Sequence, residues 1–431
     1  MGLVEKIRDG SARAGVVGLG YVGLPLAVEM AESGLEVVGL DVQQRKVDAI
    51  NAGESYILDV PSARVEALVR AKRLSATSDY SAVAELDTIN VCVPTPLRKT
   101  REPDLSFIVD SLRAMVPYMH AGQLLILEST TYPGTTEEIL LPILVEAGLE
   151  PGRDVQVAFS PERTDPGNKA YSTRTIPKVV GALTPEGNAA AAALYGRCID
   201  QVVTVSSPKV AEMVKLLENT FRSVNIALVN EMAMLCDRFG IDVWEVIDAA
   251  ATKPFGFMPF YPGPGLGGHC IPVDPLYLTW KARAEGLEPR FIELAGQINS
   301  QKPAFVVSKV VDLLNGCAKA LNGSRILVLG VAYKRDVDDV RESPSIDVMT
   351  LLLEKGAIIE YADPFVPAIC IAGRELESVD LNEKRVEAAD VVLMLTDHTA
   401  FDRKAIATKA RLIVDTRNAF KGIVSDRIIR I

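Results

Sequence analysis

Short apolar runs alternate with longer, helix-length stretches along residues 1–205. Ala14–Ala27 has the pattern of a strand, a glycine turn and the start of a helix, and the next strand, Leu35–Asp41, ends in an acid. Further strands are expected to open the segments Thr88–Pro96, Leu124–Thr131 and Val155–Asn168. Continuous apolar runs of this length are typical of strands that are buried on both faces of a parallel sheet. The pattern therefore predicts a doubly wound α/β domain.

A helical pattern replaces this alternation in the middle of the chain. Ser206–Phe239 is expected to form one long helix, with Ser206 or Ser207 at its N-cap and Pro208 in its first turn. The helix is apolar over most of its circumference, so most of it should be buried, and it is long enough to cross between domains. Pro272–Leu314 is also helical in pattern. We assign residues 206–318 to a central helical domain.

A second α/β unit is expected after Asn322-Gly323, over residues 319–431. Its strands are expected in four segments, Ser324–Lys334, Ala357–Ala362, Asp390–Thr396 and Arg411–Arg417. Only Gly330 is present at the turn after its first strand, so this unit has no second dinucleotide fingerprint.

Composition narrows the class of protein. Of the 431 residues, 48% are hydrophobic and 24% are charged, which is typical of a globular α/β protein. The formal net charge of -10 argues against binding to nucleic acid or to an anionic membrane. The six cysteines form no CxxC pair and no metal-ligand spacing, so we expect no bound metal. Without a disulfide framework, the protein is expected in a reducing compartment, the cytoplasm. We also expect no signal peptide and no membrane span.

The first α/β domain contains the clearest local motif. Gly18, Gly20 and Gly23 form GxGxxG between an apolar strand and a helix, the context in which this motif binds the pyrophosphate of a dinucleotide. Asp41 ends the second strand and is placed for the ribose hydroxyls, which favours NAD over NADP, while Arg45 weakens that preference. The first domain is therefore expected to be Rossmann-like, and the strand pattern of the second α/β unit predicts a Rossmann-like doubly wound domain as well.

The carboxyl ends of parallel strands border the ligand crevice in open α/β sheets. Thr95 and Thr130 follow two such strands and should lie beside the cofactor, although each could instead cap the next helix. The cofactor contacts expected in this domain are Gly18, Gly20, Tyr21, Val22, Gly23, Asp41, Arg45, Thr95 and Thr130.

A glycine- and proline-rich loop, Tyr261–Asp274, leads to a single cysteine, Cys270. Glycine permits close backbone approach and proline fixes φ, so this loop has a defined shape. A cysteine at the end of such a loop is a candidate nucleophile; the alternative is a buried structural cysteine. His269 cannot form a Cys-His dyad with its neighbour, because consecutive residues in extended chain point to opposite sides.

Polar residues elsewhere could serve the same site. Lys215, Asn219 and Arg222 share one face of the long helix, as a ligand-facing stripe or as a solvent-facing one. The loop after Val155 contains Glu162, Arg163 and Asp165, which could equally form a surface turn with an ion pair. The second α/β unit adds residues suited to a diphosphate or placed at strand ends: Lys334, Arg335, Arg341, Asp397, His398 and Arg417.

The motifs GLGYVG, VPTP, EST, SPER, KLLEN, GPGLGGHCIPVD, GVAYK and VRESP occur in this order. In this order, around one cysteine, the chain resembles the UDP-glucose/GDP-mannose dehydrogenase family from about residue 12 to its C-terminus. Within the family it is most similar to UDP-N-acetylglucosamine 6-dehydrogenases. Family members that act on UDP-glucose typically have a second glutamate in the loop after SPE. This chain has Arg163-Thr-Asp-Pro166 there, so the role of that acid is not transferred.

The resemblance implies two successive NAD-dependent oxidations of a sugar C6 alcohol through a thiohemiacetal and a thioester on Cys270. Lys215 and Asn219 would donate to the oxyanion, and Asp274 and Glu162 would orient the lysine or activate water. The implied contacts with the UDP-sugar are Arg163, Lys215, Asn219, Arg222, Tyr261, Gly265, Gly267, Lys334 and Arg417.

The resemblance also implies a homodimer formed about the long helix, with Arg341 near the partner's cofactor. UDP-N-acetylglucosamine is the expected substrate, with UDP-N-acetylmannosamine and UDP-glucose as alternatives. Two other classes stay open from the residues alone. A one-step hydroxyacid dehydrogenase would need no thiol, and a silent nucleotide-sugar sensor would bind the sugar without reducing NAD.

Overall fold

The computed structural model describes residues 2–57, 59–98, 100, 102–164, 171–268 and 270–431. Two compact units make up the chain. The first consists of Met1–Glu218 with Leu276–Gly286, and the second of Asn219–Pro275 with Leu287–Ile431. The segment 206–318, which we predicted as a separate helical domain, is thus divided between the two units.

The first unit is built on an eight-stranded sheet in the order β3-β2-β1-β4-β5-β6-β7-β8. Neighbouring strands are parallel except β6 and β7, which are antiparallel. The strands predicted in this region are confirmed, whereas β3, β7, β8 and the reversal at β7 were not anticipated. The strands are β1 Arg13–Val17, β2 Glu36–Leu40, β3 Leu74–Thr77, β4 Thr88–Val91, β5 Gln123–Leu127, β6 Val155–Phe159, β7 Lys178–Ala182 and β8 Val202–Val205.

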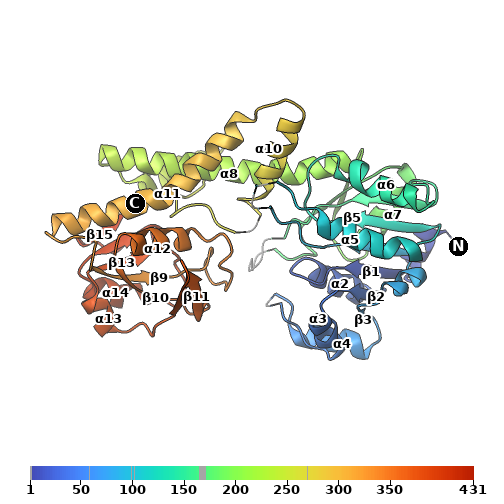
Figure 1. Cartoon of the computed structure of the whole chain (residues 1–431), viewed down its shortest axis with the longest axis horizontal. Helices are drawn as coiled ribbons and strands as arrows, with labels where there is room; N and C mark the ends of the chain where they lie inside the picture. Colours follow the sequence, from blue (N-terminus) through green and yellow to red (C-terminus); the bar gives the residue numbers. More distant parts are fainter. Residues whose placement is uncertain (1, 58, 99, 101, 165–170, 269) are drawn as a thin grey trace. The chain divides into compact units, whose positions relative to one another are not determined.

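Helices cover both faces of this sheet. Successive residues of β1 face opposite cores: Val16 packs in a cluster with Leu24 of α2, and Val17 in a cluster with Leu112 of α5. This explains why the strands are apolar at consecutive positions. The helices (Figure 1) are α1 Leu3–Asp9, α2 Gly23–Glu32, α3 Gln44–Asn51, α4 Ser62–Arg70, α5 Ser106–Met115, α6 Leu141–Glu146 and α7 Pro185–Tyr195.

The long helix predicted after Ser206 is confirmed as α8, Pro208–Phe239, drawn in green in Figure 1. The expectation that most of it is buried is wrong for the single chain, because apolar residues such as Leu217, Leu228 and Phe239 are exposed. The Ser207 hydroxyl accepts from the backbone N–H of Val210 at 3.3 Å, as expected of an N-cap. Pro272–Leu314 is not one helix. It divides into α10, Asp274–Ala284, and α11, Arg290–Gly316, because Gly286 has a φ of 77° and Pro289 precedes α11. Between α8 and α10 lies α9, Val243–Ala250.

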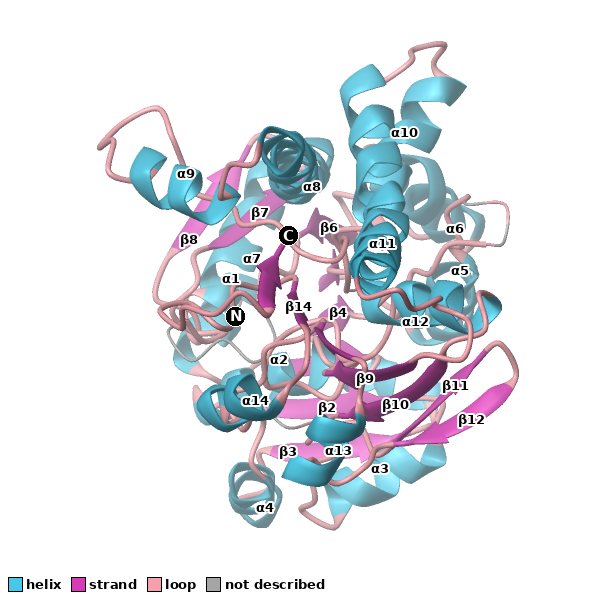
Figure 2. Ribbon diagram, turned by 90° about the vertical axis from the view of Figure 1, so that its left-hand side faces the viewer, coloured by secondary structure: helices cyan, strands magenta, loops and turns pink. Residues whose placement is uncertain are grey.

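The second unit contains a five-stranded parallel sheet in the order β10-β9-β13-β14-β15. Figure 2 shows the β11–β12 hairpin beside β10. This order is that of a doubly wound sheet, as predicted. Its strands are β9 Arg325–Leu329, β10 Ile358–Ala362, β11 Ala368–Ile371, β12 Arg374–Glu377, β13 Val391–Met394, β14 Ile413–Asp415 and β15 Ile428–Arg430, and its further helices are α12 Pro344–Glu354, α13 Glu383–Ala388 and α14 Arg403–Lys409. In the described part of the chain, no helix is long and apolar enough to cross a bilayer.

Candidate active site

The glycine turn after β1 has the shape that a dinucleotide needs. Gly18 has a φ of 90°, and a Cβ on Gly23 would lie 1.8 Å from the Gly18 carbonyl oxygen. A Cβ on Gly20 would meet nothing within 4 Å, so the backbone is open on that side. The first feature forms the tight turn, the second allows close packing of α2, and the third leaves room for a pyrophosphate. These residues fit an NAD pyrophosphate.

Asp41 lies directly beside this turn and is buried. Its Oδ2 accepts from the backbone N–H of Leu19 and from Lys46 Nζ, each at 2.9 Å, and its Oδ1 accepts from Gln43 N at 2.9 Å. A carboxylate has about four acceptor positions, so these contacts leave one for a ribose hydroxyl. Arg45 is exposed. Lys46, which we did not single out, is the cation that pairs with Asp41.

Two other strand ends of this unit are tied together. The Ser129 hydroxyl, after β5, donates to the Val93 carbonyl after β4 at 2.7 Å. The Thr95 carbonyl accepts from the Tyr277 hydroxyl of α10 at 2.7 Å, whereas Thr130 is half-buried. The loops after β4 and β5 therefore lie side by side within the unit, and the contact of Thr95 and Thr130 with the cofactor stays a prediction.

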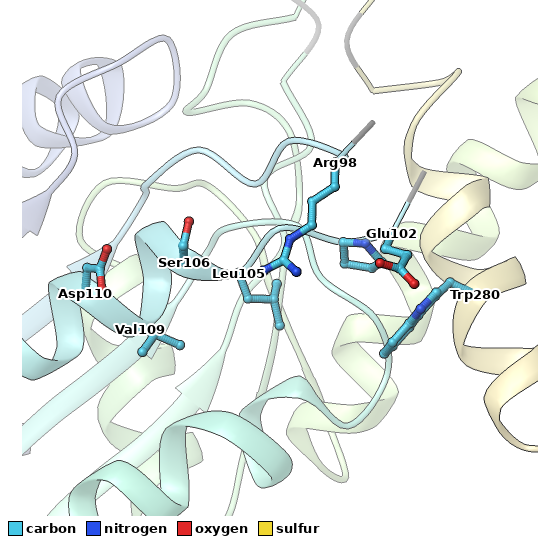
Figure 3. Close-up of a pocket in the computed structure, with 8 residues that line it drawn as sticks. Arg98, Glu102, Leu105, Ser106, Val109, Asp110 and Trp280 are labelled. Atoms are coloured by element: carbon cyan, nitrogen blue, oxygen red, sulfur yellow. The ribbon is translucent and has the colours of Figure 1, made fainter. Parts of the chain in front are cut away.

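A cavity of about 400 Å³ opens beside the loop that follows Thr95. In Figure 3 the Arg98 side chain extends beside Leu105, with Glu102 and Trp280 nearby. The Trp280 ring of α10 also packs on Tyr132, with ring centroids 5.0 Å apart. The cavity is lined by Arg98, Glu102, Pro103, Leu105, Ser106, Val109, Asp110 and Trp280.

The loop after β6 meets the polar face of α8. Lys215 is buried, and its Nζ donates to the Glu162 backbone carbonyl at 2.6 Å. The Arg163 guanidinium forks onto Glu218 of α8, at 2.6 and 3.3 Å, and donates to the Pro177 carbonyl at 2.6 Å. The structure thus brings together two motifs that lie about 50 residues apart in sequence. Asp165 lies outside the described residues.

The Glu162 carboxylate accepts from three donors. Its Oε1 accepts from the backbone N–H groups of Arg163 at 2.8 Å and Thr164 at 2.6 Å, and its Oε2 accepts from Lys178 Nζ at 3.0 Å. Burial alone would raise the pKa of Glu162, but the Lys178 charge and these hydrogen bonds outweigh it and lower the pKa to about 2. A carboxylate with so low a pKa is a weak base at neutral pH.

The cysteine loop belongs to the second unit and packs against the turn after β9 and the start of α12. A Cβ on Gly267 would lie 2.8 Å from Pro344 and 2.9 Å from Tyr333, and Gly268, with a φ of 89°, covers the Tyr333 ring. No larger residue fits at such approaches without displacing its neighbours. The loop therefore packs closely against the turn that precedes Lys334. The GPGLGGHCIPVD and GVAYK motifs, which we predicted to serve one site, are thus adjacent in this unit.

The end of this loop joins Cys270 to Asn219. Cys270 is partly exposed, and its backbone carbonyl accepts from Asp274 N at 2.8 Å in the turn that starts α10. The buried Asp274 carboxylate accepts from the Asn219 amide of α8 at 2.5 Å. A single acid therefore links the peptide of the cysteine to the amide predicted to hold an oxyanion. His269 lies outside the described residues.

Other predicted substrate residues of this unit are placed as follows. Arg417 donates to the Leu395 carbonyl at 2.8 Å; burial and the charge of Arg335 lower its pKa to about 10. Tyr261 donates to Asp248 and stacks on Trp244. Arg222 is exposed on α8, and the Arg341 guanidinium forks onto Asp339.

One polar cluster of the second unit was only partly anticipated. Asp363, after β10, accepts from the backbone N–H groups of Val331 and Ala332 and lies 3.0 Å from Nε2 of the buried His398. The Asp336 N–H donates to the other His398 nitrogen. Asp363 therefore holds the turn after β9 as Asp41 holds the turn after β1. An acid at the end of the second strand was the available sequence signal.

Known proteins with similar sequences act on nucleotide sugars. The chain is 38% identical to UDP-N-acetyl-D-glucosamine 6-dehydrogenase of Pseudomonas aeruginosa over 358 residues, 83% of each protein. It is 35% identical to NDP-N-acetyl-D-galactosaminuronic acid dehydrogenase of Ralstonia nicotianae over 94% of this chain and 96% of that protein. The solved UDP-N-acetyl-D-mannosamine dehydrogenase of Pyrococcus horikoshii superposes with a TM-score of 0.89 at 33% identity, covering 97% of this chain and 99% of that one.

Three domains of one family match consecutive parts of the chain. The family's NAD-binding domain matches residues 12–199, its central domain residues 209–301 and its UDP-binding domain residues 327–422. The first match includes the glycine turn, the second includes Lys215, Asn219 and Cys270, and the third includes Lys334 and Arg417. The chain therefore belongs to the UDP-glucose/GDP-mannose dehydrogenase family of NAD-dependent nucleotide-sugar oxidoreductases.

Proposed function

We propose that this enzyme oxidises the C6 alcohol of UDP-N-acetylglucosamine to the carboxylate in two NAD-dependent steps, with Cys270 as nucleophile. The observation that supports it best is the connection from Asn219 through Asp274 to the Cys270 peptide. A one-step alcohol dehydrogenase would need no cysteine at the end of a moulded loop, nor an amide fixed beside it.

The chemistry balances as follows. NAD, when bound, takes up the hydride that leaves C6 in each oxidation. In the first, the C6 hydroxyl also loses its proton, giving the aldehyde. The Cys270 thiolate adds to the aldehyde carbon, and the resulting oxyanion takes up a proton to give a thiohemiacetal. That hydroxyl then loses its proton with the second hydride, giving a thioester. Water cleaves the C–S bond, releasing the carboxylate, the thiol and one proton; loss of the thiol proton then restores the thiolate.

Lys215 and Asn219 supply donors for the oxyanion that develops on the C6 oxygen. They lie four residues apart on α8, and donors fixed in advance cost no reorganisation during the reaction. Asp274 orients Asn219 through its carboxylate, whereas Glu162 orients Lys215 through its backbone carbonyl. For Glu162 this supports the orienting role over the activation of water, because its carboxylate is a weak base.

The diphosphate is assigned to Lys334 and Arg417. Burial and the neighbouring Arg335 both disfavour the charged form of the Arg417 guanidinium, and an anionic ligand would offset that cost. For the sugar, the P. aeruginosa relative supports UDP-N-acetylglucosamine, while the similarity to the P. horikoshii structure makes UDP-N-acetylmannosamine the second candidate.

The decisive experiment counts NADH per sugar with a panel of UDP-linked glucose, N-acetylglucosamine, N-acetylmannosamine and N-acetylgalactosamine. We expect two NADH per UDP-N-acetylglucosamine. Cys270→Ala should still bind NAD and sugar, and it should release at most one NADH with the aldehyde. Preference for another sugar would overturn the substrate assignment, and two NADH per sugar from Cys270→Ala at the wild-type rate would overturn the covalent mechanism.

Two further assignments rest on surface and composition. Phe221, Leu228, Met232, Leu235 and Phe239 are exposed on one face of α8, at the spacing of a helix–helix seam. We assign this seam to a second copy of the chain, which gives a homodimer through α8. The six cysteines are all free, which supports a reducing compartment, the cytoplasm.

A further inference from the structure

A buried charge cluster lies behind Glu162 in the first unit. Lys178, the first residue of β7, donates to Glu128 Oε2 at 2.6 Å and to Glu162 Oε2 at 3.0 Å. The Lys178 and Glu128 side chains are 5% and 0% exposed, and that of Glu162 is 12% exposed. One cation thus joins two carboxylates that have almost no contact with solvent.

The two carboxylates differ in what else holds them. Glu128 follows β5, and its Oε1 accepts from the Asn90 amide at 2.6 Å and from the Tyr195 hydroxyl at 2.8 Å. Glu162 lies in the loop after β6, and its other donors are the N–H groups of the next two residues. Without Lys178, two buried like charges would face each other. Glu128 is held by side chains of β4 and α7, whereas the other donors to the Glu162 carboxylate are backbone N–H groups of its own loop. The Glu162 carboxylate is therefore the one that would move, although Arg163 still ties the loop to Glu218 of α8.

That loop contains the backbone carbonyl of Glu162, which accepts a hydrogen bond from the Lys215 amine. The contact between Lys215 Nζ and Glu162 O is 2.6 Å long. A shift of about 1 Å in a catalytic donor is enough to cost a large factor in rate. The neighbouring Arg163 also donates to the carbonyl of Pro177, the residue before β7, so the loop is attached to two consecutive residues, Pro177 and Lys178.

We propose that Lys178 is a positioning residue that sets the place of the Lys215 amine by fixing Glu162 and hence its backbone carbonyl. The proposal rests on the proposed function for the catalytic role of Lys215. The fixing of the loop by Lys178 does not depend on that role and can be measured separately.

The first test follows amide hydrogen exchange in peptides that cover Phe159–Thr164, in the full-length protein without substrate. Lys178→Met should accelerate exchange there, because the Arg163 and Thr164 amides lose a fixed acceptor. Exchange in peptides from α4 should not change. Lys178→Arg should keep the protection, because a guanidinium can pair with both carboxylates. Unchanged exchange in Lys178→Met would overturn the proposal, whether or not the enzyme acts on any sugar tested.

The second test is a double-mutant cycle on kcat between Lys178→Met and Lys215→Ala. Lys178→Met should lower kcat by about tenfold or more, while the KM for NAD stays within about twofold of wild type. If Lys178 acts through Lys215, it should lower kcat little further in the Lys215→Ala background. Multiplicative losses would show that Lys178 does not act through Lys215 and would overturn the proposal.

Glu162→Gln provides the same information if Lys178→Met does not fold. It is isosteric, removes the ion pair from its other end, and should show the same coupling to Lys215→Ala and the same faster exchange. Absence of both effects would overturn the proposal. Wild-type enzyme that is inactive with every sugar of the panel would overturn the proposed function instead, and the exchange experiment would still decide the role of Lys178.

Discussion

Replacing Asp41 by asparagine should weaken the preference of this enzyme for NAD over NADP. Asp41→Asn keeps the shape of the side chain but removes its charge and one of its acceptor oxygens. The amide oxygen can still accept from the buried Leu19 N–H, so the glycine turn should keep its fold. The atom that faces the ribose becomes either the amide nitrogen, which donates instead of accepting, or the amide oxygen, which has no charge.

The magnitude follows from the contacts of Asp41. Losing one hydrogen bond to a charged acceptor costs about 1.5–3 kcal/mol, or one to two decades in NAD binding. For NADP, repulsion of the 2′-phosphate disappears, and Lys46 Nζ, now 2.9 Å from Asp41 Oδ2, is released to meet the phosphate. Both effects act in the same direction on the ratio of the two cofactors. We therefore expect the ratio of kcat/KM for NAD over NADP to fall by about two decades or more.

The assay measures kcat/KM for both cofactors at saturating sugar, for four proteins. Lys46→Met alone should not improve the use of NADP, because Asp41 remains. Asp41→Asn with Lys46→Met should keep the loss with NAD and show less of the gain with NADP. A ratio in Asp41→Asn within about twofold of wild type would refute the placement of Asp41 at the ribose.

Three other predictions concern stability and assembly. Burial lowers the pKa of Lys302 from 10.5 to about 8, so the unfolded chain binds this proton more tightly than the folded protein does. The wild-type free energy of unfolding should therefore rise between pH 8 and 10.5. Lys302→Met should lack that rise and should be more stable than wild type by roughly 3 kcal/mol at pH 7. Urea unfolding across pH tests this, with the ion-paired Lys309→Met as control; identical pH slopes in Lys302→Met and wild type would contradict it. Because the pKa of Glu162 is depressed in the folded protein, its ionised carboxylate stabilises the fold above pH 4.5, and this stabilisation should be lost as the pH falls towards 2. In acid unfolding, Glu162→Gln should therefore lose less stability over this range than wild type. Identical acid unfolding curves for the two proteins would exclude this contribution of Glu162. In analytical ultracentrifugation, Leu228→Glu should sediment as a monomer where wild type sediments as a dimer. The control Arg238→Ala changes the net charge by the same amount at an exposed site of α8 outside the seam and should remain a dimer. If Leu228→Glu also remains a dimer, the interface lies elsewhere.

Features encoded over a few consecutive residues were predictable from the sequence. The strands that are buried on both faces of the sheet, the GxGxxG turn and the 32-residue α8 follow from local patterns and are confirmed. Asp41 lies directly after β2 as expected, and its contact with the ribose stays a prediction. The helical pattern of Pro272–Leu314 is confirmed, but that pattern did not locate the break between α10 and α11, which falls between Gly286 and Pro289. The positive φ of Gly286 ends the first helix, although the residues on both sides of it have a helical pattern.

Lys178 could not be recognised in this way. A lysine at the start of an apolar run is usually the solvated end of a strand, and Lys178 is followed by four buried residues of β7. Its partners lie 50 and 16 residues away in sequence, at the ends of β5 and β6. Only the sheet order, with β7 reversed next to β6, places its amine between them.

The same reasoning explains why the sequence named Lys215, Asn219, Asp274 and Glu162 but not the contacts that join them. Lys215 and Asn219 share a helix face, so their spacing alone suggests a common role. Each is fixed by a different kind of contact: Asn219 by the Asp274 carboxylate, Lys215 by a backbone carbonyl. A backbone carbonyl has no sequence signature, and its position depends on whatever fixes its loop. For Lys215 that loop is held by a buried charge cluster, in which Lys178 pairs with Glu128 and Glu162. We therefore expect, on the proposed function, that Lys178 determines where the Lys215 amine lies without contacting the substrate itself.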